Sequence, residues 1–194
     1  MKSQVNKAIF FDKDGVLNPD VDNIYDVSLD FFDYVPFILG ECKKRGFHIV
    51  MVTNQPIVAR GYISEDELFS KLLQFKHMIE KRGKRKIFDG IYFCPHHPQG
   101  TVKKYRKDCL CRKPGSQMLR DAAENLDIDL SHSYLVGDRV SDLVAGNAVR
   151  CKTILCKTGK HSLPMIKTNL LFDEKFTYSN YAIDNLESLL EFVR

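Results

Sequence analysis

The stretch IFFDKDGVLN (residues 9–18) decides the fold of this protein and begins its chemistry. The apolar run Ala8–Phe11 is typical of a buried strand, and Asp12 and Asp14 follow it directly. In an extended chain, side chains two residues apart point to the same face, so the two carboxylates lie together. Gly15 then permits a turn in which the backbone approaches a ligand. This stretch therefore predicts a ligand site at the end of the first strand.

Short apolar runs recur along the chain and alternate with helical patterns, which indicates an α/β protein with a mainly parallel sheet. We expect strands at Ala8–Phe11, Phe47–Val52, Ile91–Phe93, Tyr134–Val136 and Thr153–Leu155. We expect helices at Val35–Lys44, from an N-cap at Ser64 to about Lys81, and at Gln117–Asn125, Asp142–Ala148 and Leu186–Phe192. The order predicts a Rossmann-like, three-layer fold with helices on both faces of the sheet, forming one domain over residues 1–194.

The composition is that of a globular protein. The chain has 194 residues, of which 44% are hydrophobic and 28% charged, so it can bury one sizeable core. The net charge of +4 favours small anionic substrates but is too diffuse to indicate nucleic acid. No run approaches roughly 18 apolar residues, and the run near the N-terminus is too short for a signal peptide. We therefore expect a cytoplasmic monomer without a membrane span.

Several of the predicted strands end in polar residues. Asp12 and Asp14 follow the first strand, Thr53-Asn54-Gln55 ends the second, and Asp138 ends the fourth. Ligands bind outside the carboxyl ends of parallel strands, so these side chains should share one site. Three carboxylates repel one another unless a hard cation lies among them, which predicts Mg²⁺ and, through it, a phosphate. Asp142 lies one helical turn after Asp138 and serves equally well as a helix cap or as a supporting residue.

A second group of residues predicts a zinc site. Cys94 and His96 are separated by twelve residues from Cys109 and Cys111, and this Cys₃His set matches a closed tetrahedral site with a structural role. His97 is an alternative ligand, but its spacing to the cysteines fits less well. The other cysteines, Cys42, Cys151 and Cys156, are expected to be small core residues.

Four motifs together resemble the haloacid dehalogenase superfamily of phosphatases. They are the Asp-x-Asp-Gly stretch (residues 9–18), VTNQ (residues 52–55), Lys113 in CRKPG, and VGDRVSDLVAG (residues 136–146). The resemblance implies that Asp12 is the nucleophile and Asp14 the general acid and base. It implies that Asp12, the Asp14 backbone carbonyl and Asp138 hold Mg²⁺, and that Thr53 and Lys113 hold the transferring phosphoryl group. The gaps between motifs leave no room for a large cap domain.

Within the superfamily, the zinc loop CPHHPQG…CLCRKPG (residues 94–115) resembles that of the D-glycero-D-manno-heptose 1,7-bisphosphate phosphatases, as does the loop that begins at Asn54 and Gln55. The resemblance implies removal of one phosphate, at C7, in the synthesis of nucleotide-activated heptose for surface glycans. A bisphosphate needs a second anion contact, for which Arg60, Arg112 and Arg139 are the candidates. The alternatives are a histidinol-phosphate phosphatase, which shares the nucleophile motif and a similar loop, and a zinc-organised nucleic-acid-binding module.

Overall fold

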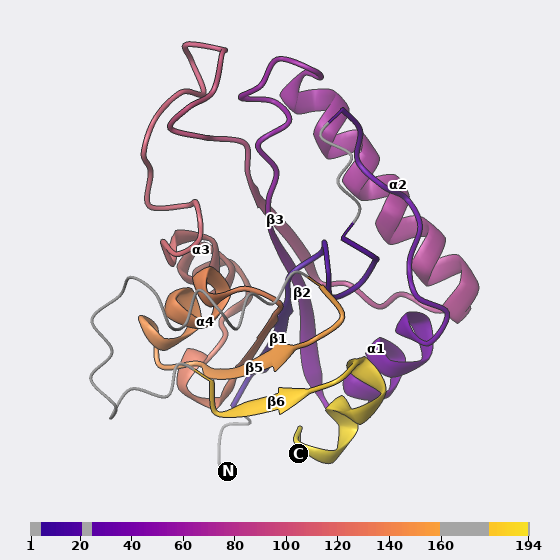
Figure 1. Cartoon of the computed structure of the whole chain (residues 1–194). Helices are drawn as coiled ribbons and strands as arrows, with labels where there is room; N and C mark the ends of the chain where they lie inside the picture. Colours follow the sequence, from indigo (N-terminus) through magenta and orange to yellow (C-terminus); the bar gives the residue numbers. More distant parts are fainter. Residues whose placement is uncertain (1–4, 21–24, 160–178, 194) are drawn as a thin grey trace.

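The computed structural model describes residues 5–20, 25–159 and 179–193. A parallel sheet with the strand order β3-β2-β1-β4-β5-β6 runs through its centre (Figure 1). The strands are β1 (Lys7–Phe11), β2 (Phe47–Asn54), β3 (Gly90–Cys94), β4 (Tyr134–Gly137), β5 (Lys152–Cys156) and β6 (Tyr181–Ile183). The α-helices are α1 (Val35–Lys44), α2 (Glu65–Gly83), α3 (Gln117–Leu126) and α4 (Val140–Asn147), and the short 3₁₀ helices are η1 (Leu130–His132) and η3 (Leu186–Glu191).

The predicted parallel α/β architecture is confirmed, with two differences near the C-terminus. The sequence analysis missed β6, whose three residues pair with β5 at the edge of the sheet and are too few for a periodic signal. The segment predicted as a helix over Leu186–Phe192 is a 3₁₀ helix over Leu186–Glu191. Its Asn185 side chain accepts a hydrogen bond from the backbone N–H of Glu187, which caps this short turn.

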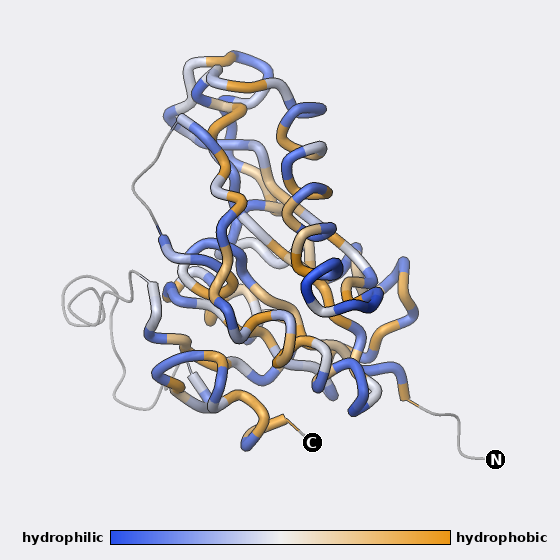
Figure 2. Tube along the Cα trace, turned by 90° about the vertical axis from the view of Figure 1, so that its right-hand side faces the viewer, coloured by the Kyte–Doolittle hydropathy of each residue, from blue (hydrophilic) through white to orange (hydrophobic). Residues whose placement is uncertain are grey.

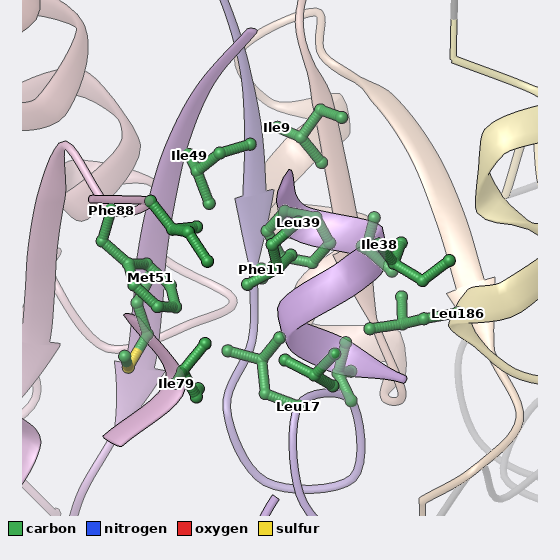
Figure 3. Packing of buried hydrophobic residues seen from close by; sticks show 14 of the residues in the cluster. Ile9, Phe11, Leu17, Ile38, Leu39, Ile49, Met51, Ile79, Phe88 and Leu186 are labelled. Carbon is green, nitrogen blue, oxygen red and sulfur yellow. The ribbon is translucent and has the colours of Figure 1, made fainter. Parts of the chain in front are cut away.

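Helices cover both faces of the sheet because the central strands are apolar on both sides. On one face, alternate residues of β1 and β2 (Ile9, Phe11, Ile49 and Met51) pack against α1, α2 and η3 (Figure 3). On the other face, the intervening residues (Ala8, Phe10, Val50 and Val52) pack against α3 and α4. The period of two along each strand thus separates the two halves of the core.

The long helix α2 shows how local sequence produces these layers. Ser64 accepts a hydrogen bond from the backbone N–H of Glu67, and the Glu67 carboxylate accepts one from the backbone N–H of Ser64. This capping box is the one that the sequence predicts. The helix buries Leu68, Leu72, Phe75 and Ile79, so hydrophobic and hydrophilic positions alternate along it in Figure 2.

The register of the sheet brings the motifs to one edge. Phe11 of β1 pairs with Met51 of β2 on one side and with Val136 of β4 on the other. Asp12 therefore lies between the ends of two neighbouring strands, near Thr53 and Asp138. The segments that follow these strands are loops and single helices, and no cap domain covers this edge within the described ranges. The described helices include none long and apolar enough to cross a membrane.

Candidate active site

Lys113 is the cation at the centre of the site. It reaches the sheet edge from the end of the zinc loop, and it is 5% exposed. Its Nζ lies 2.7 Å from Asp12 Oδ1 and 2.6 Å from Asp142 Oδ1, and donates a hydrogen bond to the carbonyl of Val52 at 2.9 Å. Burial opposes its charged form, but the negative charges of Asp12 and Asp142 outweigh burial and raise the pKa of Lys113 above its ordinary value. The ammonium is therefore charged at neutral pH.

The surroundings of Asp12 fix its position and change the pKa of its carboxyl group. Its backbone N–H donates to the carbonyl of Val136, which fixes it at the end of β1. Burial raises the pKa of Asp12 from 3.8 to about 6, and the charges of Asp142 and Asp14 act in the same direction while Lys113 opposes them. Asp12 is still ionised at pH 7, in a buried place where water competes weakly, which suits a nucleophile.

Asp14 has both carboxylate oxygens held by neighbouring side chains. Oδ1 accepts hydrogen bonds from Lys13 Nζ at 2.8 Å and Asn18 Nδ2 at 3.1 Å, and Oδ2 accepts one from Gln55 Nε2 at 2.7 Å. Burial opposes ionisation, but the Lys13 charge and these hydrogen bonds outweigh it and lower the pKa of Asp14. The sequence analysis did not single out Lys13, which is fully buried with its ammonium over the Phe75 ring. The feature of the sequence that could have identified Lys13 is its position between Asp12 and Asp14.

Asp138 lies beneath the site with no exposed surface. The backbone of Gly15, at φ +88°, approaches it so closely that a Cβ at this position would come within 2.6 Å of Asp138 Oδ2. A glycine is therefore required at this turn, as the sequence predicts.

The buried carboxylates fit a hard divalent cation. Asp12, Asp138 and Asp142 each offer an oxygen, and these oxygens lie within 4.8 Å of one another. Asp12 and Asp138 belong to the predicted Mg²⁺ set, whereas Asp14 turns its carboxylate toward Lys13 and Gln55, which leaves its backbone carbonyl as the predicted ligand. Oxygen donors with excess negative charge are what Mg²⁺ prefers.

Asp142 combines the two roles that the sequence left open. Its Oδ2 accepts a hydrogen bond from the backbone N–H of Arg139 at 3.0 Å, at the start of α4, and its Oδ1 pairs with Lys113. The sequence indicated both roles from its place one turn beyond Asp138, but not that Lys113 is its partner.

The second strand delivers Thr53, Asn54 and Gln55 as predicted. Asn54 exchanges two hydrogen bonds of 3.0 Å with the backbone of Lys113, so it holds the zinc loop to the end of β2. Gln55 Nε2 contacts Thr53 Oγ1 at 3.0 Å as well as Asp14. Both amides thus position other site residues, and their direct binding of substrate stays a prediction.

A cavity of about 510 Å³ opens above these residues. Besides the reaction centre, it is lined by Arg60, Arg112 and Arg139, as predicted, and by His97 and Asp20, which the sequence analysis did not place there. The Arg139 Nη2 lies 2.7 Å from Asp20 Oδ2, so Arg139 ties the segment after β1 to α4. Among the described residues, neither Arg60 nor Arg112 forms an ion pair with a carboxylate, which leaves them better able to bind an anion.

The zinc ligands predicted from the sequence come together beside the cavity. Cys94 Sγ lies 3.6 Å from His96 Nδ1, 3.5 Å from Cys109 Sγ and 3.1 Å from Cys111 Sγ. The six cysteines of the chain are free thiols, and the three others are buried in the core as expected. Four donors at these separations fit a closed tetrahedral zinc site, without room for a catalytic water. His96 belongs to this group, whereas His97 turns to the cavity.

A doubly wound parallel sheet whose edge joins Asp12, Asp14, Lys113 and Asp138 defines a phosphatase of the haloacid dehalogenase type. A family model described as HAD-hydrolase-like matches residues 110–187.

Comparison with known proteins shows to which family within this class the chain belongs. D-glycero-beta-D-manno-heptose-1,7-bisphosphate 7-phosphatase of Haemophilus influenzae is 45% identical over 159 residues, covering 80% of this chain and 84% of that protein. The protein of the same name from Pasteurella multocida is 36% identical over 192 residues, covering 98% of each. The chain therefore belongs to the D-glycero-beta-D-manno-heptose-1,7-bisphosphate 7-phosphatase family.

The solved structures agree with this assignment. The D,D-heptose 1,7-bisphosphate phosphatase from B. bronchiseptica, complexed with magnesium and phosphate, superposes with a TM-score of 0.76 at 27% identity. The alignment covers 96% of this chain and 99% of that one. The corresponding structure from Burkholderia thailandensis has a TM-score of 0.62 at 21% identity and supports the fold alone.

Proposed function

We propose that this phosphatase removes the C7 phosphate of D-glycero-D-manno-heptose 1,7-bisphosphate. One observation carries the proposal. A single cavity contains Asp12 and Lys113 at the reaction centre, and Arg60 and Arg112 line the same cavity. Such a cavity suits a substrate with two phosphate groups, because guanidinium groups bind phosphate through paired hydrogen bonds. The names of the relatives support the same substrate.

The proposed reaction passes through an aspartyl-phosphate. An Asp12 carboxylate oxygen attacks the phosphorus, and the bond from phosphorus to the sugar oxygen breaks. Asp14 is ionised in the free enzyme and takes up a proton as the charged phosphate enters beside it. It gives that proton to the leaving oxygen, then removes one from the water that hydrolyses the aspartyl-phosphate. Thr53 and Lys113 hold the phosphoryl oxygens throughout, and the positive charge of Lys113 offsets the negative charge of the transferring phosphoryl group.

The two predicted metals have separate tasks. Asp12, Asp138 and the Asp14 backbone carbonyl would hold Mg²⁺, which when bound offsets the charge of the phosphoryl group. Cys94, His96, Cys109 and Cys111 would hold zinc, which orders the loop that carries Arg112 and Lys113. We place the reaction in the cytoplasm, within the synthesis of nucleotide-activated heptose for surface glycans.

The test is phosphate release from both anomers of the heptose bisphosphate, with histidinol phosphate as comparator and Asp12→Asn as the control. We expect preference for a heptose bisphosphate that requires Asp12 and Mg²⁺, since Asn retains the shape of the side chain but is a poor nucleophile. Preference for histidinol phosphate would replace the proposed substrate. Turnover by Asp12→Asn would overturn the mechanism.

A further inference from the structure

His97 lines the cavity but has no part in the reaction described above. It follows the zinc ligand His96, and its half-buried ring shares the cavity wall with Arg60 and Arg112. The three side chains come from two loops that are separate in the sequence.

Backbone contacts hold these two loops together. The backbone N–H of Val102 donates to the carbonyl of Ala59 at 3.0 Å, and Thr101 Oγ1 donates to the carbonyl of Arg60 at 2.9 Å. Within the zinc loop, Arg112 Nη1 donates to the carbonyl of His96 at 3.2 Å. Both loops lie in the upper part of Figure 1, where the zinc loop is rose and the loop that follows β2 is purple. The mutual placement of Arg60, His97 and Arg112 is therefore set by the protein before a ligand arrives.

The hydrogen bonds of His97 determine which ring nitrogen is the donor. Its Nδ1 accepts a hydrogen bond from the backbone N–H of Gln99 at 3.1 Å. A ring nitrogen that accepts an N–H bond carries no proton, so in this arrangement the N–H of the ring lies on Nε2. The backbone of His97 is fixed as well, since its N–H donates to Tyr105 and its carbonyl accepts from Gly100. His97 thus supplies one N–H donor of defined position.

We propose that His97 is a specificity-determining residue whose Nε2–H, with Arg60 and Arg112, binds the second, non-reacting phosphate of the substrate. This inference rests on the proposed function and deepens it. The imidazole N–H adds a directional hydrogen bond to an anion that the two arginines attract.

The test compares two variants that each retain one of the two hydrogen-bonding functions of the imidazole ring. His97→Gln keeps an N–H donor near the place of Nε2, whereas His97→Asn keeps an acceptor near Nδ1 for the Gln99 N–H. We measure kcat/KM for heptose 1,7-bisphosphate and for phenyl phosphate, and we take the ratio of the two as the selectivity. For a hydrogen bond to a charged group, we expect His97→Asn to lower the selectivity about tenfold or more, through KM. We expect His97→Gln to retain most of it.

The controls separate this inference from its alternatives. His77→Asn, on the exposed face of α2, should retain the selectivity of the unaltered enzyme, and zinc content should remain equal in all variants. Retention of selectivity by His97→Asn with loss in His97→Gln would show that His97 only holds the Gln99 turn, and would overturn the inference. If the unaltered enzyme shows no preference for the bisphosphate, the proposed function fails, and the inference fails with it. A preference that neither variant lowers overturns the inference alone.

Discussion

The ammonium of Lys113 lies 2.6 Å from the Oδ1 of Asp142, a residue that also caps the first turn of α4. The same ammonium lies 2.7 Å from Asp12. One buried cation therefore separates two buried carboxylates, and helix α4 is anchored to the lysine that we propose holds the transferring phosphoryl group. We therefore expect the stability of the site and its reactivity to depend on the same charge.

Replacement of Lys113 by Met should damage both properties. The substitution leaves Asp12 and Asp142 buried without their cation, and we expect a loss of about 3–5 kcal/mol in the free energy of unfolding in Mg²⁺-free buffer. It also removes a donor to the phosphoryl group, so kcat should fall about 10²–10³-fold. Urea unfolding and steady-state kinetics measure the two effects. Lys81→Met, exposed in the last turn of α2, is the control, and unchanged stability in Lys113→Met would refute the assigned role of the ion pairs.

The proposed zinc site can be tested by measuring bound zinc, without measuring enzyme activity. Cys109→Ser replaces a thiolate ligand by a weakly binding hydroxyl, and we expect the zinc retained after dialysis to fall well below about one per chain. The loop should then hold Arg112 less firmly, so KM for the bisphosphate should rise. Cys42→Ala, buried in α1, is the matched control because it removes a core thiol outside the cluster. Full zinc content in Cys109→Ser would exclude Cys109 as a ligand.

The requirement for Mg²⁺ should depend on pH through Asp12. Burial raises the pKa of Asp12 to about 6, and a protonated carboxyl binds no cation, so protons compete with Mg²⁺ below that pH. Between pH 7.5 and pH 5, the Mg²⁺ concentration for half-maximal rate should rise about tenfold. At saturating Mg²⁺, the rate should depend less on pH over the same range. A half-maximal concentration that stays constant down to pH 5 would contradict the raised pKa.

Two glycines with similar positive φ angles allow the effect of backbone strain to be measured apart from the effect of a close contact. Gly15 has φ +88° and Gly46 has φ +81°, so alanine at either position should destabilise the fold by about 1–2 kcal/mol. A Cβ at Gly15 would meet Asp138 Oδ2 at 2.6 Å, whereas a Cβ at Gly46 would meet nothing within 4 Å. We therefore expect Gly15→Ala alone to raise the Mg²⁺ requirement, measured by Mg²⁺ titration of activity. Equal Mg²⁺ requirements in both variants would show that Asp138 tolerates the added methyl group.

The strands and the residues at their ends could be predicted from the sequence because their signals are local. Continuous apolar runs on short strands specify a sheet covered on both faces, and parallel strands carry Asp12, Thr53 and Asp138 to one edge. Two closely spaced pairs, Cys94 with His96 and Cys109 with Cys111, predicted the zinc group in the same way, since the members of each pair lie two positions apart. By contrast, β6 gave no signal, because three edge residues form a strand only where β5 offers a partner.

The sequence by itself determined the class of fold, the strand-end carboxylates and the zinc-binding set. Only the tertiary structure decided what surrounds them: that Asp142 pairs with Lys113, that Arg139 is occupied by Asp20, and that His97 faces the cavity beside Arg60. The physical reason is the distance along the chain over which each kind of signal acts. Periodicity and ligand spacing act over a few residues, whereas the charge, burial and hydrogen-bond partners of each group depend on segments that meet only when the sheet and its loops have packed.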